Sequence, residues 1–194
     1  MTITFDPAKY DGYIFDCDGT LADTMPLHYR AWQRVVSGLG GSFPEDLFYA
    51  LGGRSTEEIF AVLRDRQGLV IPDIVQATQL KERYFMELLP EVQPIGAVVD
   101  IARQSQGRLP LAVASGGPRS NVLPTLAAIG VEALFPVVVC VEDYARAKPY
   151  PDPFLEAARQ LGVAASACLV FEDSPLGLQA AEAAGMQWVF VPRT

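Results

Sequence analysis

The sequence has 194 residues, half of them apolar, and a formal net charge of -8 at pH 7. A chain of this length and composition can bury a real core, which excludes a disordered protein or a mini-protein and suggests one domain with a sizeable insert. The acidic balance leaves no surplus of lysine and arginine to displace counterions from nucleic acid. A small anion must therefore be captured locally, and we expect a metal ion to assist.

Neither secretion nor membrane insertion is expected. The N-terminal segment has no basic region followed by an apolar stretch, and no apolar run approaches the roughly 20 residues that span a bilayer. The three cysteines, Cys17, Cys140 and Cys168, lie inside or beside apolar runs, which predicts buried free thiols in a reducing compartment. We therefore expect a cytoplasmic protein whose partner is a small molecule, not a membrane or nucleic acid. The sequence leaves the oligomeric state open.

The first expected strand is the apolar run Tyr13-Ile14-Phe15, which ends at Asp16-Cys17-Asp18-Gly19-Thr20. This pattern is typical of a buried strand that delivers polar residues at its carboxyl end. Residues 23–93 follow as a mostly helical stretch, with turns at Gly38–Pro44 and Leu51–Ser55. The helices expected there are Leu27–Val36, Thr56–Arg66 and Asp73–Leu89. We interpret residues 23–93 as a helical cap inserted after the first strand.

Strands and helices alternate after this insert. The further strands expected are Leu109–Ala114, Pro136–Val141, Cys168–Phe171 and Trp188–Val191. The helices between them are Ile95–Gln104, Arg119–Ile129, Asp152–Leu161 and Pro175–Ala184. Apolar strands joined by helices predict an α/β fold, with a Rossmann-like parallel sheet covered by helices on both faces. Residues 1–22 and 94–194 would form this α/β core.

Acidic side chains follow two of the expected strands. Asp16 and Asp18 point the same way from an extended strand end, because strand side chains repeat every second residue. Carboxylates at a buried sheet end are too costly to leave without a cation. Together with Glu172 and Asp173 they form a set of oxygen donors suited to Mg²⁺. We therefore predict a magnesium site formed by Asp16, Asp18, Glu172 and Asp173.

Four motifs in this sequence resemble, in order, those of the haloacid dehalogenase-like superfamily. They are Asp16-x-Asp18-Gly19-Thr20-Leu21-x-Asp23-Thr24, Val113-Ala114-Ser115-Gly116, Lys148-Pro149-x-Pro151-Asp152-Pro153-Phe154 and Phe171-Glu172-Asp173-Ser174-x-x-Gly177. The resemblance spans essentially the whole chain. The expected cap and the wording of the motifs are similar to the β-phosphoglucomutase and sugar-phosphatase subfamily.

The resemblance implies a role for each motif residue. Asp16 would attack phosphorus and form an aspartyl-phosphate, while Asp18 would protonate the leaving oxygen, then activate water and contact the metal through its backbone carbonyl. Ser115 would donate a hydrogen bond to the phosphoryl oxygens, and Lys148 would neutralise charge on the nucleophile and phosphoryl group. Asp173 would bind Mg²⁺ directly.

Glu172 would bind the same ion directly or through water. Four further residues are candidates for substrate binding: Thr20, His28, Arg54 and Gly116. His28 matches a histidine that contacts the general acid or the substrate in β-phosphoglucomutase-like proteins, although a surface or capping role is also open. Arg54 is either a solvated loop cation or a residue that selects the substrate.

A rival motif, Cys140-x5-Arg146, has the spacing of cysteine-dependent phosphatases. Its intervening residues contain Glu142 and Asp143 and no glycine. These acids would repel a phosphate and raise the pKa of the thiol, so we set this alternative aside.

A mutase of the β-phosphoglucomutase type is the main alternative to a phosphatase. Thr20 stands where such mutases carry a bulkier aliphatic residue, and Thr56 stands where their cap supplies an arginine, so both departures favour hydrolysis. Dehalogenases lack the second aspartate, so Asp18 speaks against dehalogenation, and phosphonate hydrolysis is a minor alternative. A catalytically silent binding module would have lost a motif residue, and none is lost. Fructose 1-phosphate, 6-phosphogluconate and related sugar phosphates are the substrates that the family suggests.

Overall fold

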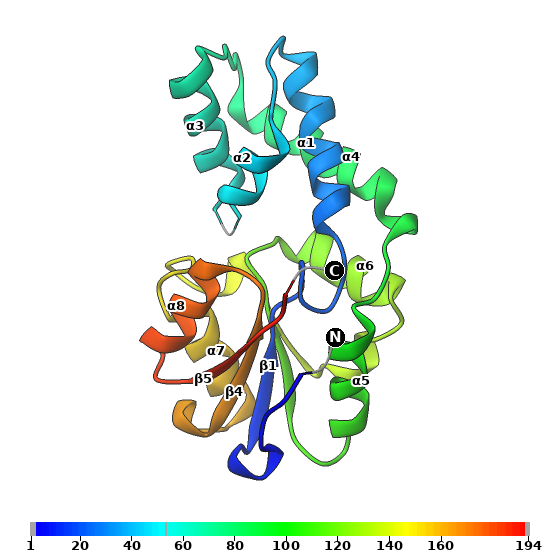
Figure 1. The fold of residues 1–194 in the computed structure, drawn as a ribbon, viewed down its shortest axis with the longest axis vertical. Helices are drawn as coiled ribbons and strands as arrows, with labels where there is room; N and C mark the ends of the chain where they lie inside the picture. Colours follow the sequence, from blue (N-terminus) through cyan, green and yellow to red (C-terminus); the bar gives the residue numbers. More distant parts are fainter. Residues whose placement is uncertain (1–2, 53, 193–194) are drawn as a thin grey trace. The chain divides into compact units, whose positions relative to one another are not determined.

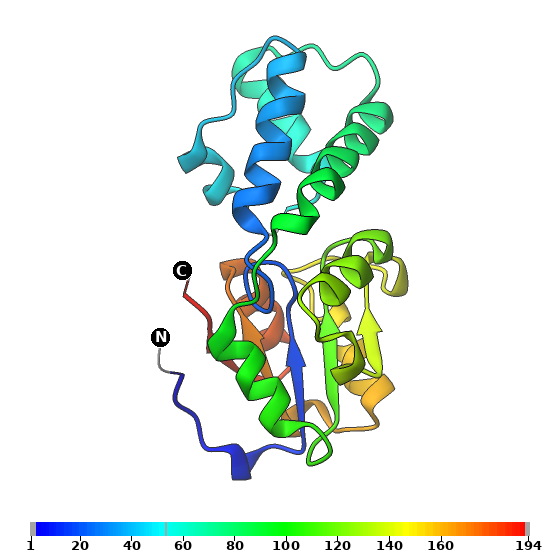
Figure 2. The ribbon, with the colours of Figure 1, turned by 90° about the vertical axis from the view of Figure 1, so that its right-hand side faces the viewer.

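The computed structural model describes residues 3–52 and 54–192. The chain forms two compact units, one from Met1–Asp23 with Gln93–Thr194 and one from Thr24–Val92. The first contains the sheet and is called the α/β unit, and the second, over its described residues, contains helices and no strand and is called the helical unit (Figures 1 and 2).

The α/β unit is built on a parallel five-stranded sheet in the order β3-β2-β1-β4-β5. The strands are β1 (Gly12–Phe15), β2 (Leu111–Ala114), β3 (Val137–Val139), β4 (Cys168–Glu172) and β5 (Gln187–Phe190). The three central strands are buried along their whole length, which explains why their sequences are continuous apolar runs. The predicted Rossmann-like α/β fold is confirmed.

Helices cover both faces of this sheet, as Figures 1 and 2 show. The helices are α5 (Gly96–Ser105) and α6 (Arg119–Ala128) on one face, and α7 (Asp152–Leu161) and α8 (Pro175–Ala183) on the other. Ile14 and Val170 pack with Phe154 of α7 in one core cluster. Phe15 points to the opposite face, where its ring stacks on Phe171 at 4.6 Å. Strand β2 lies next to β1 on one side and β4 lies next to it on the other, so the strand order reverses at β1. Ligands of such sheets bind at this reversal point, outside the carboxyl ends of the strands.

Short 3-10 turns complete the α/β unit. They are η1 (Pro7–Lys9), η3 (Glu132–Leu134), η4 (Val141–Asp143) and η5 (Ala165–Ala167). Of these, η4 links β3 to the loop that carries Lys148.

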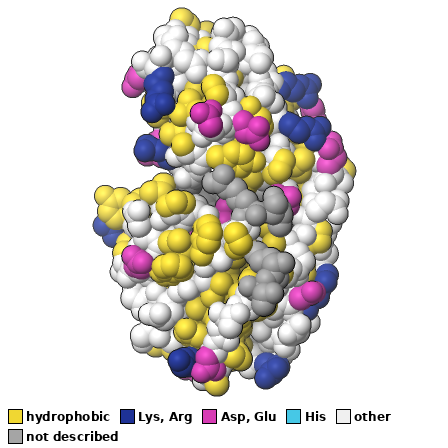
Figure 3. Space-filling view, viewed as in Figure 1, with side chains coloured by type: hydrophobic (Ala, Val, Ile, Leu, Met, Phe, Trp, Pro, Cys, Tyr) yellow, Lys and Arg dark blue, Asp and Glu magenta, His cyan; other side chains and the backbone are white. Residues whose placement is uncertain are grey.

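The edge strand β5 differs from the others because much of it faces solvent. Trp188 is 39% exposed and Phe190 is 48% exposed. Figure 3 shows hydrophobic side chains gathered on this face of the α/β unit. The apolar run correctly predicted a strand here, but three of its four residues are exposed.

The helical unit packs around aromatic side chains. Its helices are α1 (Met25–Gly38), α2 (Glu45–Ala50), α3 (Thr56–Gln67) and α4 (Ile74–Leu88), followed by η2 (Leu89–Glu91). Trp32, Phe48 and Phe60 lie in its core. The three helices predicted here form, and α2 is a fourth that the sequence did not predict. That residues 23–93 act as a cap stays a prediction.

The two chain segments that connect the units lie side by side where they leave the α/β unit. The N–H of Asp23 donates to the carbonyl of Gln93 at 2.9 Å, and the N–H of Ile95 donates to the carbonyl of Leu21 at 2.9 Å. The helical unit is therefore inserted at one closed point of the α/β unit. Within the described ranges, no helix has the length and apolar character needed to cross a membrane.

Candidate functional site

Asp16 lies at the carboxyl end of β1, in the α/β unit. Its N–H donates to the carbonyl of Phe171 at 2.9 Å, which extends the pairing of β1 with β4 by one residue. Only 6% of Asp16 is exposed. A carboxylate thus stands on a rigid strand end where water has little access.

Lys148 bridges the ends of β1 and β4. Its Nζ lies 2.7 Å from Asp16 Oδ1 and 2.6 Å from Glu172 Oε2. Burial lowers the pKa of this ammonium, but the two carboxylates raise it by more, so the net shift is upward and Lys148 stays charged. The ring of Phe154 lies under the ammonium, with its centroid 4.9 Å from Nζ.

Glu172 is held by donors on both carboxylate oxygens. Its Oε1 accepts from the N–H of Asp173 at 3.2 Å, the N–H of Ser174 at 2.9 Å and the Ser174 hydroxyl at 2.7 Å, and its Oε2 accepts from Lys148. Ser174 in turn accepts from the N–H of Gly177 at 3.0 Å and so caps α8. The start of α8 therefore fixes the position of Glu172.

Three carboxylates and one ammonium, that of Lys148, lie together at these strand ends. Oxygens of Asp16, Glu172 and Asp173 all lie within 4.8 Å of one another. Burial, and then the charge of Glu172, raise the pKa of Asp16 well above its usual value, and the same causes raise the pKa of Asp173 to about 7. The surplus negative charge and the all-oxygen donor set fit a hard divalent cation such as Mg²⁺. Because both oxygens of Glu172 already have donors, Asp16 and Asp173 are better placed than Glu172 to bind it directly.

Ser115 follows β2 and faces Asp18. Its Oγ lies 3.5 Å from Asp18 Oδ2 and accepts from the N–H of Gly117 at 3.0 Å. Its backbone N–H donates to the carbonyl of Val139, which ties the loop to β3. The carboxylate of Asp18 does not belong to the group of three acids, and Gly116 is exposed on the loop. The structure thus gathers Asp16, Lys148, Glu172 and Asp173, and separately pairs Ser115 with Asp18.

Thr20 is directed toward Asp173. It is fully buried, and its hydroxyl lies 3.4 Å from Asp173 Oδ1. Gly19 before it has a φ of +86°, and a side chain there would come within 2.4 Å of Asp173 Oδ2. A hydroxyl in this position orients the carboxylate of Asp173, and no part of Thr20 is open to solvent.

His28 belongs to the helical unit and contacts a buried lysine. Its ring stacks on Phe85 at 3.9 Å, and its Nδ1 lies 3.0 Å from Lys81 Nζ. We did not predict Lys81 as a functional residue. The available signal was its place in the buried stripe of α4, where Ala77, Lys81 and Phe85 follow one another at four-residue spacing.

Arg54 also belongs to the helical unit. It is exposed, and its N–H donates to the carbonyl of Leu51 at 3.2 Å. Gly53, which we placed in the same turn, lies outside the described residues. Substrate binding by His28 and Arg54 stays a prediction.

The cysteines do not support thiol chemistry. Cys17, Cys140 and Cys168 are free and buried, as predicted. Burial is the main cause that raises the pKa of Cys140 to about 11. Arg146, its partner in the rival motif, instead forms a two-point ion pair with Asp152.

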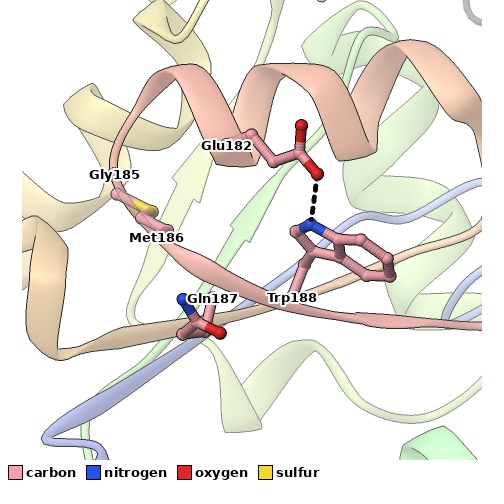
Figure 4. Close-up of a pocket in the computed structure, with 5 residues that line it drawn as sticks. All are labelled: Glu182, Gly185, Met186, Gln187 and Trp188. Carbon is pink, nitrogen blue, oxygen red and sulfur yellow. Dashed lines mark hydrogen bonds between the residues drawn. The ribbon is translucent and has the colours of Figure 1, made fainter.

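A separate hollow lies between α8 and β5 (Figure 4). It has a volume of about 580 Å³ and is lined by Glu182, Gly185, Met186, Gln187 and Trp188. The indole N–H of Trp188 donates to Glu182 across it at 3.1 Å. It opens at the start of β5, the end of the strand opposite to the acidic cluster, and contains none of the predicted site residues.

Comparisons with known proteins agree with the motif assignment. A family model described as haloacid dehalogenase-like hydrolase matches residues 13–191. The fructose-1-phosphate phosphatase YqaB of Escherichia coli is 36% identical over 183 residues, which cover 94% of this chain and 97% of that protein. The phosphorylated carbohydrates phosphatase of Thermotoga maritima is 31% identical over 185 residues, covering 93% of this chain and 84% of that one.

The solved structures give the same fold. The structure of CbbY from Rhodobacter sphaeroides in complex with phosphate superposes with a TM-score of 0.83 at 28% identity. The superposition covers 92% of this chain and 84% of that one. Both units of the chain are therefore included in the likeness.

Proposed function

This chain belongs to the haloacid dehalogenase-like hydrolase family as a phosphoric monoester hydrolase, and we propose that it removes the phosphoryl group of a small sugar phosphate with Asp16 as nucleophile and Mg²⁺ as cofactor. The observation that supports this proposal most is the contact of Lys148 with Asp16 and Glu172 beside Asp173. A surface of solvated acids would not bury a lysine among three carboxylates.

In the proposed first step, an Asp16 oxygen attacks phosphorus in line and the ester oxygen leaves. Lys148 holds the carboxylate of Asp16 in place and partly neutralises the three phosphoryl oxygens. Mg²⁺, bound by Asp16, Asp173 and the backbone carbonyl of Asp18, with Glu172 acting through water, would supply further positive charge at the phosphoryl group. Ser115 donates its hydroxyl to a phosphoryl oxygen.

Asp18 would move the protons of both steps. As a carboxylic acid it protonates the leaving alcohol, and as a carboxylate it then takes a proton from the water that hydrolyses the aspartyl-phosphate. The contact of Ser115 with Asp18 supports this assignment, because both groups must lie beside the same phosphoryl group.

The substrate class follows from the relatives. Two of them are named for phosphorylated sugars or carbohydrates, so we propose a sugar phosphate as substrate. Thr20, Gly116, His28 and Arg54 are the residues that we propose to bind it, with Thr20 acting through Asp173. Such a metabolite and buried free thiols suit the cytoplasm, where we propose that the protein works.

The test is phosphate release from a panel of phosphorylated sugars and from a generic aryl phosphate, with Mg²⁺, with EDTA and with Ca²⁺. We expect EDTA to abolish release, Mg²⁺ to restore it and Ca²⁺ to inhibit, because Ca²⁺ accepts more ligands and can hold Asp16 in a non-attacking pose. Full activity in EDTA would contradict the metal assignment. Conversion of one sugar phosphate into an isomer without phosphate release would instead support the mutase.

A further inference from the structure

The loop that carries Ser115 and Gly116 is tied to the segment that leads from β3 toward Lys148. The N–H of Val141 donates to the carbonyl of Gly117 at 3.2 Å, and the carboxylate of Glu142 accepts the N–H of Arg119 at 3.0 Å. These contacts hold the end of the loop, where α6 begins. The start of the loop is held by the backbone hydrogen bond of Ser115 to Val139 and by one side chain, that of Tyr144.

The Tyr144 hydroxyl donates a hydrogen bond to the carbonyl of Ser115 at 3.2 Å. The ring of Tyr144 packs against the core cluster that contains Phe154 and Val139. Burial raises the pKa of Tyr144 to about 12, so the hydroxyl keeps its proton and remains a donor at neutral pH. A packed ring thus aims a permanent donor at one backbone carbonyl.

The direction of that carbonyl decides the direction of a second group. In a trans peptide the C=O and the following N–H point to opposite sides, so fixing the Ser115 carbonyl also fixes the N–H of Gly116. The same peptide adjoins the Ser115 side chain, whose hydroxyl faces Asp18. Rotation of this peptide would therefore displace both donors of the loop.

We propose that Tyr144 is a positioning residue that orients the Ser115–Gly116 peptide, and through it the hydrogen-bond donors that receive the phosphoryl group. This inference rests on the proposed phosphatase function, because it assigns the loop a phosphoryl ligand. The hydroxyl of Tyr144 acts through the carbonyl of Ser115 and does not itself bind the phosphoryl group in this role. Its effect should appear in phosphate affinity and not in metal affinity.

The test compares the full-length wild type with Tyr144→Phe and with the control Tyr13→Phe. Tyr13 is a buried tyrosine on β1 of the same unit, so the control also removes one hydroxyl and keeps the ring. The measurements are the inhibition constant of inorganic phosphate, kcat/KM for an aryl phosphate, the Mg²⁺ concentration for half activity, and the melting temperature. Amide exchange at Gly116 and Gly117 reports on the loop independently of turnover.

For Tyr144→Phe we expect the phosphate inhibition constant to rise about three- to tenfold, with a similar fall in kcat/KM, as the loss of one neutral hydrogen bond predicts. The Mg²⁺ requirement should stay within about twofold, since the hydrogen bond reaches none of the three acids. The amides of Gly116 and Gly117 should exchange faster than in Tyr13→Phe, and the melting temperatures of the two variants should agree.

An unchanged phosphate inhibition constant in an active Tyr144→Phe enzyme would overturn this inference alone and leave the proposed function intact. Equal losses of phosphate and Mg²⁺ affinity would also overturn it, because they would indicate general loosening of the unit. A wild type that neither releases phosphate with Mg²⁺ nor binds it would overturn the proposed function and this inference together. If Tyr144→Phe is too unstable to assay, unchanged exchange at the two glycines below its melting temperature would count against the inference.

Discussion

At the scale of single residues, the pairing of Asp16 with Lys148 gives the sharpest test of the chemistry. Asp16→Asn keeps the size of the side chain and an oxygen that can accept from Lys148, but an amide is not a nucleophile toward phosphorus. We expect kcat to fall by several orders of magnitude, as for other members of a catalytic unit, and the fold to persist. Steady-state kinetics and circular dichroism measure the two outcomes.

The matched control is Asp100→Asn, which makes the same chemical change on the exposed side of α5. It should keep wild-type activity. If Asp16→Asn retained more than about a hundredth of the wild-type kcat, an aspartyl-phosphate on Asp16 would be the wrong intermediate.

The sequence located the acidic residues but not their orientation. Asp16 and Glu172 could be placed because each ends a strand of a parallel sheet, and the carboxyl ends of such strands meet. The hydroxyl of Thr20, which follows the left-handed backbone of Gly19, lies beside Asp173. Substrate binding by Thr20 stays a prediction. Two-residue periodicity holds only along an extended strand, so it could not predict where the chain points after this turn.

At the scale of elements, the junction of β4 with α8 links local structure to the site. Gly177 lies in the first turn of α8, and a methyl group there would come within 2.0 Å of Glu172 Cδ. Alanine is the better helix former by roughly 1 kcal/mol, so helix propensity alone would favour Gly177→Ala. We expect the opposite, because the new methyl group must displace the carboxylate that Lys148 and Ser174 hold.

Gly177→Ala should therefore lower the free energy of unfolding by about 1 to 3 kcal/mol, the usual cost of overpacking. It should also raise the Mg²⁺ concentration needed for half activity. Gly96→Ala is the control, because Gly96 begins α5 and a methyl group there meets no atom within 4 Å. Chemical denaturation and Mg²⁺ titration of activity measure both effects. Equal behaviour of the two variants would mean that the carboxylate of Glu172 moves without cost.

The longer helices and the apolar strands were predictable, whereas the six-residue helix α2 was not. Helix α7 begins and ends where its apolar period predicted, and β4 differs by one residue at its end. Helix α2 was missed because its six residues span less than two turns, too few for a 3.6-residue period to emerge. The expected strand Pro136–Val141 reached the first residue of turn η4, whereas β3 ends at Val139.

At the scale of the whole molecule, substrate selection is proposed to reside in the helical unit. Arg54→Ala should raise KM for sugar phosphates, with a loss of about 1 to 3 kcal/mol in binding free energy, the range of a charge-assisted hydrogen bond. The KM for an aryl phosphate should change little. Arg66→Ala is the control, since Arg66 is an exposed arginine in the last turn of α3. Equal KM increases for both substrates would indicate a structural role, and no increase would indicate a solvated arginine.

The connection between the units allows a larger test of the same proposal. The segments that enter and leave the helical unit are bonded to each other, through the N–H of Asp23 and the carbonyl of Gln93 and through the antiparallel pair Ala22 and Pro94. A tight turn can join two such antiparallel residues, so a short Gly-rich linker could replace residues 24–92 without straining β1 or α5.

The acidic cluster, Lys148, Ser115 and Tyr144 all belong to the unit that remains. We therefore expect the shortened protein to fold and to release phosphate from an aryl phosphate in a Mg²⁺-dependent reaction. It should be slower than the full chain if the helical unit acts as the predicted cap, because a cap excludes water from the reacting groups. Its kcat/KM values for different sugar phosphates should become nearly equal, since His28 and Arg54, the two proposed substrate-binding residues of the helical unit, are gone. Circular dichroism and the substrate panel measure these outcomes, and a shortened protein with the full chain's order of preference would place selectivity in the α/β unit instead.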